Sequence, residues 1–307
     1  MIYKKIIFAF LMCSLLLFSS CDTEETETSS VGTFIGGTAG VVAEFVNLNP
    51  PTEFDQSSAV PLKVLLKNMG ESQIASGKAS VKVFSPSPSS LGISDTYKST
   101  SGELYELDDL TKTGGEQEID FGKISYKPDV TNEEHITLRA RYCYDYNTHA
   151  NIDVCLKSKT SAEADESICS TDGEKVGSGM VSSAPVQVTS VLEDPRPNKV
   201  QFAIKIVNQG TGIVYNPASS CINLDDDDTR LTEKNKLDIK ITSPVEIECD
   251  FKDGESSSEG TITLNENKEY ILRCWKDIEE TLEDKLKITL TYKYRDQIKK
   301  EVTVLED

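Results

Sequence analysis

Apolar and polar residues alternate along most of the chain after residue 40. This alternation places one face of an extended segment on a core and the other in water, as in an antiparallel sheet. Turn-forming clusters such as Asn68-Met-Gly70, Thr113-Gly-Gly115 and Asn208-Gln-Gly210 separate the alternating segments. The pattern predicts an all-β fold of β-sandwich type. The clearest alternating segments are 60–67, 79–84, 135–142, 200–207, 237–241 and 286–294.

The same pattern gives three local predictions. Residues 286–294 and 298–305 are expected to form a hairpin that turns at Arg295-Asp-Gln297. Residues 147–180 are polar and are expected to form a long loop. Helix is expected only as a turn or two within residues 277–284.

The first 21 residues have the layout of an export signal. A short basic start is followed by an apolar run from Ile6 to Phe18, and small residues precede Cys21. The run is shorter than the roughly 20 residues that span a membrane. We interpret residues 1–20 as a signal peptide and Cys21 as the lipidated first residue of the mature chain. An ordinary secretory signal and a short uncleaved anchor remain the alternatives.

The export signal and the charge together define the expected surroundings. Residues 21–33 are polar and acidic, which is typical of a solvated tether. The protein is therefore expected at the cell surface, anchored by lipid to the outer face of the membrane. The formal net charge of −19 would repel nucleic acid and anionic lipid. We do not expect nucleic acid as a partner.

Cysteine usage fits an oxidising compartment. An even number of cysteines in an exported chain predicts up to three disulfides. The spacing favours the pairs Cys155–Cys169 and Cys249–Cys274, and leaves Cys143 for Cys221 or another partner. The sequence has no C-x-x-C motif and only two histidines, so neither a zinc site nor another cofactor is expected.

An internal repeat suggests two related β units. Residues 61–70 and 200–210 are both alternating strands that end in Asn-x-Gly, and each follows an apolar strand. One core seldom organises more than about 250 residues. The Gly- and Ser-rich stretch 176–183 offers a joint between the units. We therefore predict a first immunoglobulin-like sandwich over residues 34–183 and a second over residues 184–307.

The repeated strand with its Asn-x-Gly turn, within an exported all-β chain, resembles the immunoglobulin-like modules of prokaryotic surface proteins. The cell-adhesion-related module CARDB is similar in this strand and turn. Residues 34–40, followed by Asn49-Pro-Pro-Thr-Glu-Phe54, also resemble a group of archaeal surface proteins with two such domains. The resemblance implies a surface location and assembly, and it transfers no catalytic residues.

Two clusters are candidate binding sites. The run Asp225, Asp226, Asp227 and Asp228 offers oxygen ligands for calcium, but a solvated loop between strands is favoured because the spacing is not that of an EF-hand. Tyr142, Tyr144 and Tyr146 share one face of a strand, opposite Cys143 and Asp145. These tyrosines form either a binding face or part of the core, and the core is favoured.

The functional prediction follows from these features. No nucleophile motif, phosphate-binding glycine loop or metalloprotease motif is present, so an enzyme is not expected. The leading hypothesis is a non-enzymatic, membrane-anchored adhesion protein that binds other surface proteins or polymers. The alternative is a subunit of a surface filament or layer that assembles by strand exchange through residues 31–46. A flexible lead-in segment is the simpler interpretation of the glycine-rich part of that stretch.

Overall fold

We examined the chain as a computed structural model. The structure describes residues 33–160, 168–243, 246–251 and 256–307. Residues 1–31 and 32–307 separate into two units by their internal contacts, and the described strands and helices belong to the second unit. Strands dominate the described residues and one short α-helix is present, so the prediction of an all-β fold is confirmed.

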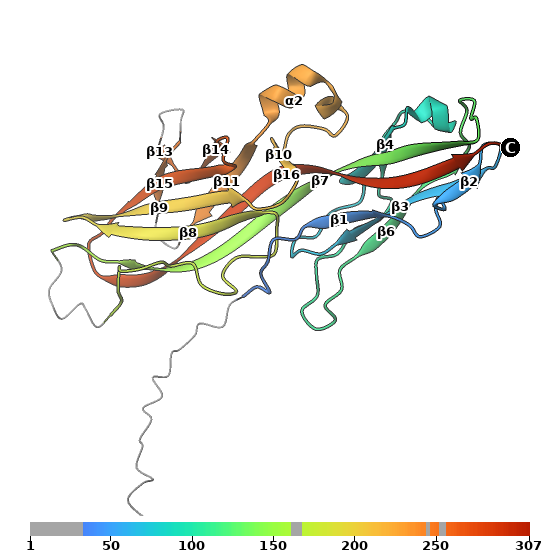
Figure 1. The fold of residues 1–307 in the computed structure, drawn as a ribbon. Helices are drawn as coiled ribbons and strands as arrows, with labels where there is room; N and C mark the ends of the chain where they lie inside the picture. Colours follow the sequence, from blue (N-terminus) through green and yellow to red (C-terminus); the bar gives the residue numbers. More distant parts are fainter. Residues whose placement is uncertain (1–32, 161–167, 244–245, 252–255) are drawn as a thin grey trace, which may run out of the picture. The chain divides into compact units, whose positions relative to one another are not determined.

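The strands are named in chain order (Figure 1). The N-terminal half contains β1 (Val41–Phe45), β2 (Glu53–Asp55), β3 (Val60–Asn68), β4 (Ala79–Ser85), β5 (Lys98–Ser99), β6 (Glu116–Ile124) and β7 (Glu133–Leu156), with the short 3-10 helix η1 (Pro88–Leu91). The C-terminal half contains β8 (Val186–Pro195), β9 (Lys199–Asn208), β10 (Ile213–Tyr215), η3 (Asn223–Asp225), α2 (Asp227–Glu233), β11 (Lys236–Thr242), β12 (Glu248–Asp250), β13 (Ser256–Ser257), β14 (Glu259–Thr263), β15 (Glu269–Asp277) and β16 (Leu282–Leu305).

These strands form three sheets. One has the order β1-β3-β6, and another has the order β13-β12-β15-β9-β8. The largest sheet has the order β14-β11-β16-β7-β4-β5, and β10 and β2 add to β16 at its side. The pairings are antiparallel except for that of β2 with β16, which is parallel. The buried faces of the three sheets contribute to one hydrophobic core.

The two halves repeat one strand order. The strands β1, β3, β6, β4 and β7 correspond to β8, β9, β15, β11 and β16. The last strand of each half is 24 residues long, and the two pair along their full length, from Glu133 opposite Leu305 to Leu156 opposite Leu282. Each long strand therefore runs beside both halves (Figure 1). The division at residues 183 and 184 stays a prediction.

Three local predictions were wrong. Residues 295–297 are not a turn, because β16 continues through them with Arg295 opposite Cys143 of β7. The expected loop begins only after Leu156, because β7 continues with Thr148 at a fully buried position. The only α-helix in the described part of the chain lies at Asp227–Glu233, whereas residues 277–284 hold the end of β15 and the start of β16.

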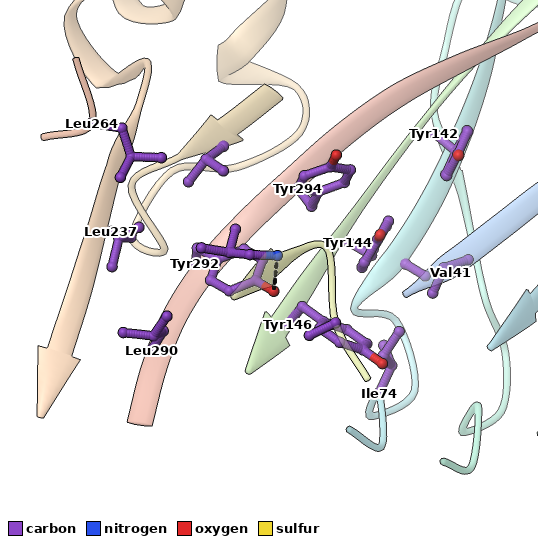
Figure 2. Close-up of a cluster of buried hydrophobic side chains, with 14 of the residues drawn as sticks. Val41, Ile74, Tyr142, Tyr144, Tyr146, Leu237, Leu264, Leu290, Tyr292 and Tyr294 are labelled. Atoms are coloured by element: carbon purple, nitrogen blue, oxygen red, sulfur yellow. Dashed lines mark hydrogen bonds between the residues drawn. The ribbon is translucent and has the colours of Figure 1, made fainter. Parts of the chain in front are cut away.

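The central strands bury a cluster of tyrosines. Tyr142, Tyr144 and Tyr146 of β7 and Tyr292 and Tyr294 of β16 point into one interior region (Figure 2). Their neighbouring ring centroids lie 5.5–6.4 Å apart, in the range of favourable aromatic contacts. The prediction that this face of β7 is core is confirmed.

Each half anchors its Asn-x-Gly turn to one of these tyrosines. The Tyr146 hydroxyl donates to Asn68 Oδ1 over 3.2 Å, and the Tyr294 hydroxyl lies 3.4 Å from Asn208 Oδ1. The glycine two residues after each asparagine approaches the same hydroxyl. A Cβ added at Gly70 or at Gly210 would lie 2.1 Å from that oxygen. The repeated turn therefore requires glycine because the tyrosine occupies the space of a side chain.

Candidate functional site

The outer face of the β8-β9-β15 sheet carries a groove. The inward positions of these strands are buried in the core, so the alternate positions face solvent. Gln201 of β9 lies opposite Asp194 of β8 and Trp275 of β15. In the next outward row, Ala203 lies between Leu192 and Arg273. The small Ala203 side chain leaves a depression between its larger neighbours.

This groove, of about 650 Å³, combines apolar, aromatic and charged groups. Leu192 is 48% exposed, and Ile271, on the same face of β15, is 55% exposed. Arg196 forms an ion pair with Asp194 at one end. Such a mixture suits a ligand that offers both an apolar face and polar groups. The lining residues are Leu192, Glu193, Asp194, Arg196, Gln201, Phe202, Ala203, Asp250, Arg273, Cys274 and Trp275.

Trp275 is the only tryptophan of the chain. It lies half-buried on the solvent side of β15, next to the inward Cys274, which is bonded to Cys249 of the neighbouring strand β12. The disulfide and the buried Phe202 beneath the groove hold this part of the sheet together. The indole ring therefore lies on a rigid support, as a preorganised binding surface requires.

Sequence reasoning missed this groove. From this strand it considered only Cys274, as a disulfide partner of Cys249. A usable signal was present, because Ile271, Arg273 and Trp275 are all large side chains at the solvent-facing positions of one strand. Which other strands lie beside them depends on pairing between distant segments, and the sequence pattern does not give that pairing.

The structure contains three disulfides that join the six cysteines beyond Cys21. They are Cys143–Cys221, Cys155–Cys169 and Cys249–Cys274. The last two are the pairs that the spacing favours, and the first is one of the alternatives left open for Cys143. Disulfides persist in oxidising surroundings, which indicates an environment outside the cytosol.

The acidic run begins with a carboxylate surrounded by cations. Asp225 Oδ1 accepts from Arg141 Nη1 over 2.6 Å, and Oδ2 accepts from Lys82 Nζ over 2.9 Å. Arg295, which is 8% exposed, lies 3.6 Å away and donates to the carbonyl of Leu224. Burial alone would raise the pKa of Asp225, but Lys82 and Arg141 hold it below its ordinary value.

The remaining aspartates of the run belong to α2. Asp226 caps the helix by accepting from the backbone N–H of Thr229 over 2.9 Å, and Asp227 pairs with Arg230. The expected loop is therefore a 3-10 turn followed by a short helix. The described residues contain no group of three or more His, Cys, Asp or Glu side chains that could hold a metal ion.

The lead segment contacts its own chain. The N–H of Phe34 donates to the Gly179 carbonyl, and Glu71 accepts from the N–H groups of Ile35 and Gly36. Residues 41–45 form β1, which pairs with β3 from Val41 opposite Asn68 onward. Residues 31 and 32 of the proposed exchange segment, the signal peptide and Cys21 lie outside the described residues.

The histidines do not form a site with each other. His135 is exposed and its Nδ1 lies 3.1 Å from the Thr303 hydroxyl. His149 is half-buried, and burial lowers its pKa. Within the described ranges, the structure has no helix both long and apolar enough to cross a membrane.

Comparisons with known proteins give no family for this chain. A scan against models of protein families finds no match, and a search of curated proteins finds no similar sequence.

Proposed function

We propose that this chain is a non-enzymatic adhesion protein, exported and held at the outer face of the membrane through Cys21, and that the groove around Trp275 binds its ligand. The ligand would be a segment of another surface protein or of a surface polymer. The observation that carries the proposal is the row formed by Ile271, Arg273 and the half-buried Trp275 on the solvent-facing side of a disulfide-supported strand.

The residue types of the groove support binding. Tryptophan and arginine contribute most of the free energy in many protein interfaces when they lie near the centre of a contact. Arg273 and Arg196 stand near Asp194 and Asp250, so the groove offers hydrogen-bond donors and acceptors of both charges. A planar indole beside such groups favours a ligand with a flat apolar surface edged by polar groups.

The single tryptophan makes the test direct. Because all tryptophan fluorescence of the protein comes from Trp275, binding in the groove should change the intensity or the maximum of the emission excited at the red edge, where the tyrosines do not absorb. The protein is titrated with envelope polysaccharides and with surface proteins from cells that express it. A saturable change supports the proposal, whereas binding measured by calorimetry without a fluorescence change would place the ligand elsewhere.

Variants separate the groove from the rest of the surface. Arg273→Ala should weaken binding at least tenfold while it retains Trp275 as the reporter. Tyr105→Ala is the matched control. Tyr105 is 61% exposed and lies in the N-terminal half, away from the groove, next to Leu104, which pairs with Ile74. Equal affinities of the two variants would contradict a role for the groove.

The assembly alternative has one supporting observation. The strand β1 lies at the edge of its sheet and pairs only with β3 among the described strands, so it presents an edge to solvent. Exchange through residues 31–46 would move this strand to the sheet of a neighbouring copy. Deletion of residues 31–46 should abolish polymers seen by immunogold electron microscopy, and polymers that persist after the deletion would contradict the alternative.

A further inference from the structure

The groove around Trp275 crosses four neighbouring strands of one sheet. Its outward positions run from β8 over β9 and β15 to β12. Neighbouring strands lie about 4.8 Å apart, so the groove extends over about 14 Å. Its floor dips in the middle, where the small Ala203 stands between Leu192 and Arg273. The groove is therefore elongated, and it suits a chain of linked units better than one compact molecule.

Three polar side chains in the groove have no partner within the protein. In the part of the chain that the structure describes, the side chains of Gln201, Asp250 and Arg273 form no hydrogen bond and no ion pair. Asp250 faces Arg273 across β12 and β15, because Cys249 before it lies opposite Cys274. The carboxamide donates and accepts, the carboxylate accepts and the guanidinium donates. A ligand with groups that both donate and accept would satisfy all three.

The charges that line the groove balance each other. Arg196 pairs with Asp194, and Arg273 faces Asp250. The carboxylate of Glu193 is fully buried on the inner side of the sheet and does not reach the groove surface. The formal net charge of −19 further disfavours an anionic polymer. These charges favour a neutral ligand.

The floor of the groove offers no free backbone edge. At Gln201 and Ala203, β9 is paired with β8 on one side and with β15 on the other, so its N–H and carbonyl groups bond within the sheet. A peptide that binds by strand addition needs an unpaired edge. The hydroxyls of a sugar each donate and accept, and they can bond directly to side chains. The groove therefore matches a polysaccharide better than an extended peptide.

Trp275 supplies the apolar surface that a sugar ring needs. Its half-buried side chain lies on the solvent side of a strand that the Cys249–Cys274 disulfide supports. The face of an aromatic ring is partly negative, and the C–H groups on one face of a sugar ring are partly positive, so the two faces attract each other. Leu192, which is 48% exposed, adds apolar surface at the other side of the groove.

We propose that the groove around Trp275 binds a neutral polysaccharide of the cell envelope. One sugar ring lies against the indole of Trp275, and hydroxyls of the polymer bond to Gln201, Arg273 and Asp250. The inference rests on the proposed function, because it uses the same groove and names the chemical class of the ligand.

The test compares three fractions from the envelopes of cells that express the protein. Neutral polysaccharide, acidic polysaccharide retained by anion exchange, and envelope protein are each titrated against the full chain, with Trp275 fluorescence as the readout. The neutral fraction should give a saturable change that survives protease treatment. A change with the acidic or the protein fraction alone would overturn the sugar assignment and leave the proposed function standing. No change with any fraction would contradict both.

Two variants test the neutrality of the ligand, and both retain Trp275 as the reporter. Arg273→Ala and Asp250→Asn should each weaken binding of the neutral fraction about tenfold, because each removes hydrogen bonds to a charged group. Asp129→Asn is the matched control, an exposed aspartate of the N-terminal half, and should leave the affinity unchanged. Tighter binding by Asp250→Asn would indicate an anionic ligand, and tighter binding by Arg273→Ala a cationic one. Either result would overturn the proposal.

Salt provides an independent check on the same preparation. Raising the NaCl concentration from about 0.05 M to about 0.5 M should change the affinity of the native chain less than about twofold, because salt screens interactions between charges. A loss of tenfold or more would show that opposite charges hold the ligand, and it would also overturn the proposal.

Discussion

The Tyr294 hydroxyl lies 3.4 Å from Asn208 Oδ1 and accepts from the N–H of Gly212 over 2.8 Å. The same hydroxyl occupies the space beside Gly210, where a Cβ would come within 2.1 Å of it. Tyr146 makes the equivalent contacts with the turn that starts at Asn68. One tyrosine in each half thus links the Asn-x-Gly turn of one sheet to a central strand of another.

The first prediction is that Gly210→Ala is destabilising and is partly rescued by removal of the tyrosine hydroxyl. Overpacking of this kind typically costs about 1–3 kcal/mol in the free energy of unfolding. In Gly210→Ala/Tyr294→Phe the closest atom is gone, although the Pro185 Cβ at 2.9 Å and the ring carbon at 3.0 Å still crowd the methyl group. Urea denaturation of the single and double variants measures the rescue.

Gly70→Ala, alone and combined with Tyr146→Phe, provides the control for these variants. A Cβ there would also lie 2.3 Å from the Ala39 carbonyl oxygen and 2.5 Å from that of Ser183. Because backbone atoms cannot turn aside as a side chain can, Tyr146→Phe should not rescue Gly70→Ala. Equal rescue at both glycines would show that the hydroxyl contact is not the cause of the strain.

The second prediction concerns the cations around Asp225. Asp225→Asn keeps the shape of the side chain but leaves Arg141 and Arg295 without their counter-charge, while Lys82 retains its ion pair with Asp95. We expect a loss of about 3 kcal/mol in the free energy of unfolding, because removal of one partner leaves partly buried charges uncompensated.

Asp228→Asn is the matched variant, since Asp228 belongs to the same acidic run but is exposed in the first turn of α2. Its effect should stay within about 0.5 kcal/mol, as for most surface substitutions. Thermal or chemical unfolding of both variants decides the matter. Equal losses would show that the run acts only through its total charge.

The sequence pattern identified strands well where alternation was regular and failed where polar residues occupy the core. The strands β3, β4, β9 and β11 lie where period-two alternation predicts them. The end of β7 was missed because Thr148 occupies a buried position, where its hydroxyl donates to the Val186 carbonyl over 2.6 Å. From the sequence alone, a threonine whose hydroxyl is hydrogen-bonded inside the core cannot be told from a loop residue.

Burial on both faces obscured the middle of β16. Tyr294 faces the tyrosine cluster, while Lys293 and Arg295 on the opposite face are also buried, at 6% and 8% exposure. Arg295 donates to the Leu224 carbonyl and lies over the Tyr215 ring, and these contacts, which bury it, depend on the tertiary fold. The groove around Trp275 was hidden for a similar reason, since β15 is distant in sequence from β8 and β9, with which it forms the groove.

The third prediction ranks the disulfides by loop length. Cys143–Cys221 joins residues 78 apart, whereas Cys249–Cys274 and Cys155–Cys169 span 25 and 14 residues. In the loop-entropy model these bridges stabilise the fold by about 4.5, 3.5 and 3 kcal/mol. Paired Cys→Ala variants, compared by urea denaturation, should follow this order. A greater loss from Cys155–Cys169 than from Cys143–Cys221 would contradict the ranking.

The fourth prediction is a pH dependence of stability that comes from Glu193. Its side chain is fully buried, and Oε1 accepts from the N–H of Cys155 over 2.7 Å while Oε2 lies 3.5 Å from Lys175 Nζ. Burial raises the pKa of Glu193 to about 7, although the Cys155 N–H and the Lys175 ammonium oppose the change. The folded chain therefore binds a proton between pH 4.5 and 7 that the unfolded chain has released.

The sign follows from this difference. Between pH 4.5 and 7 the free energy of unfolding contributed by Glu193 falls as pH rises, by about 1.4 kcal/mol per pH unit at most, and it levels off above pH 7. Glu193→Gln, which keeps an acceptor for Cys155, should remove this slope and be more stable than the native chain at pH 8. Lys175 would retain its bond to the Ser170 carbonyl.

The measurement is the difference between the two proteins, by urea denaturation at pH 5, 6, 7 and 8. This subtraction removes the contribution of His149 to the free energy of unfolding. That contribution rises with pH in the same range, because burial lowers the pKa of His149. Native and Glu193→Gln chains share His149, so their difference isolates the carboxylate. A constant difference across the four pH values would mean that Glu193 has the same ionisation in the folded and unfolded chains, which its full burial beside a single long ion pair argues against.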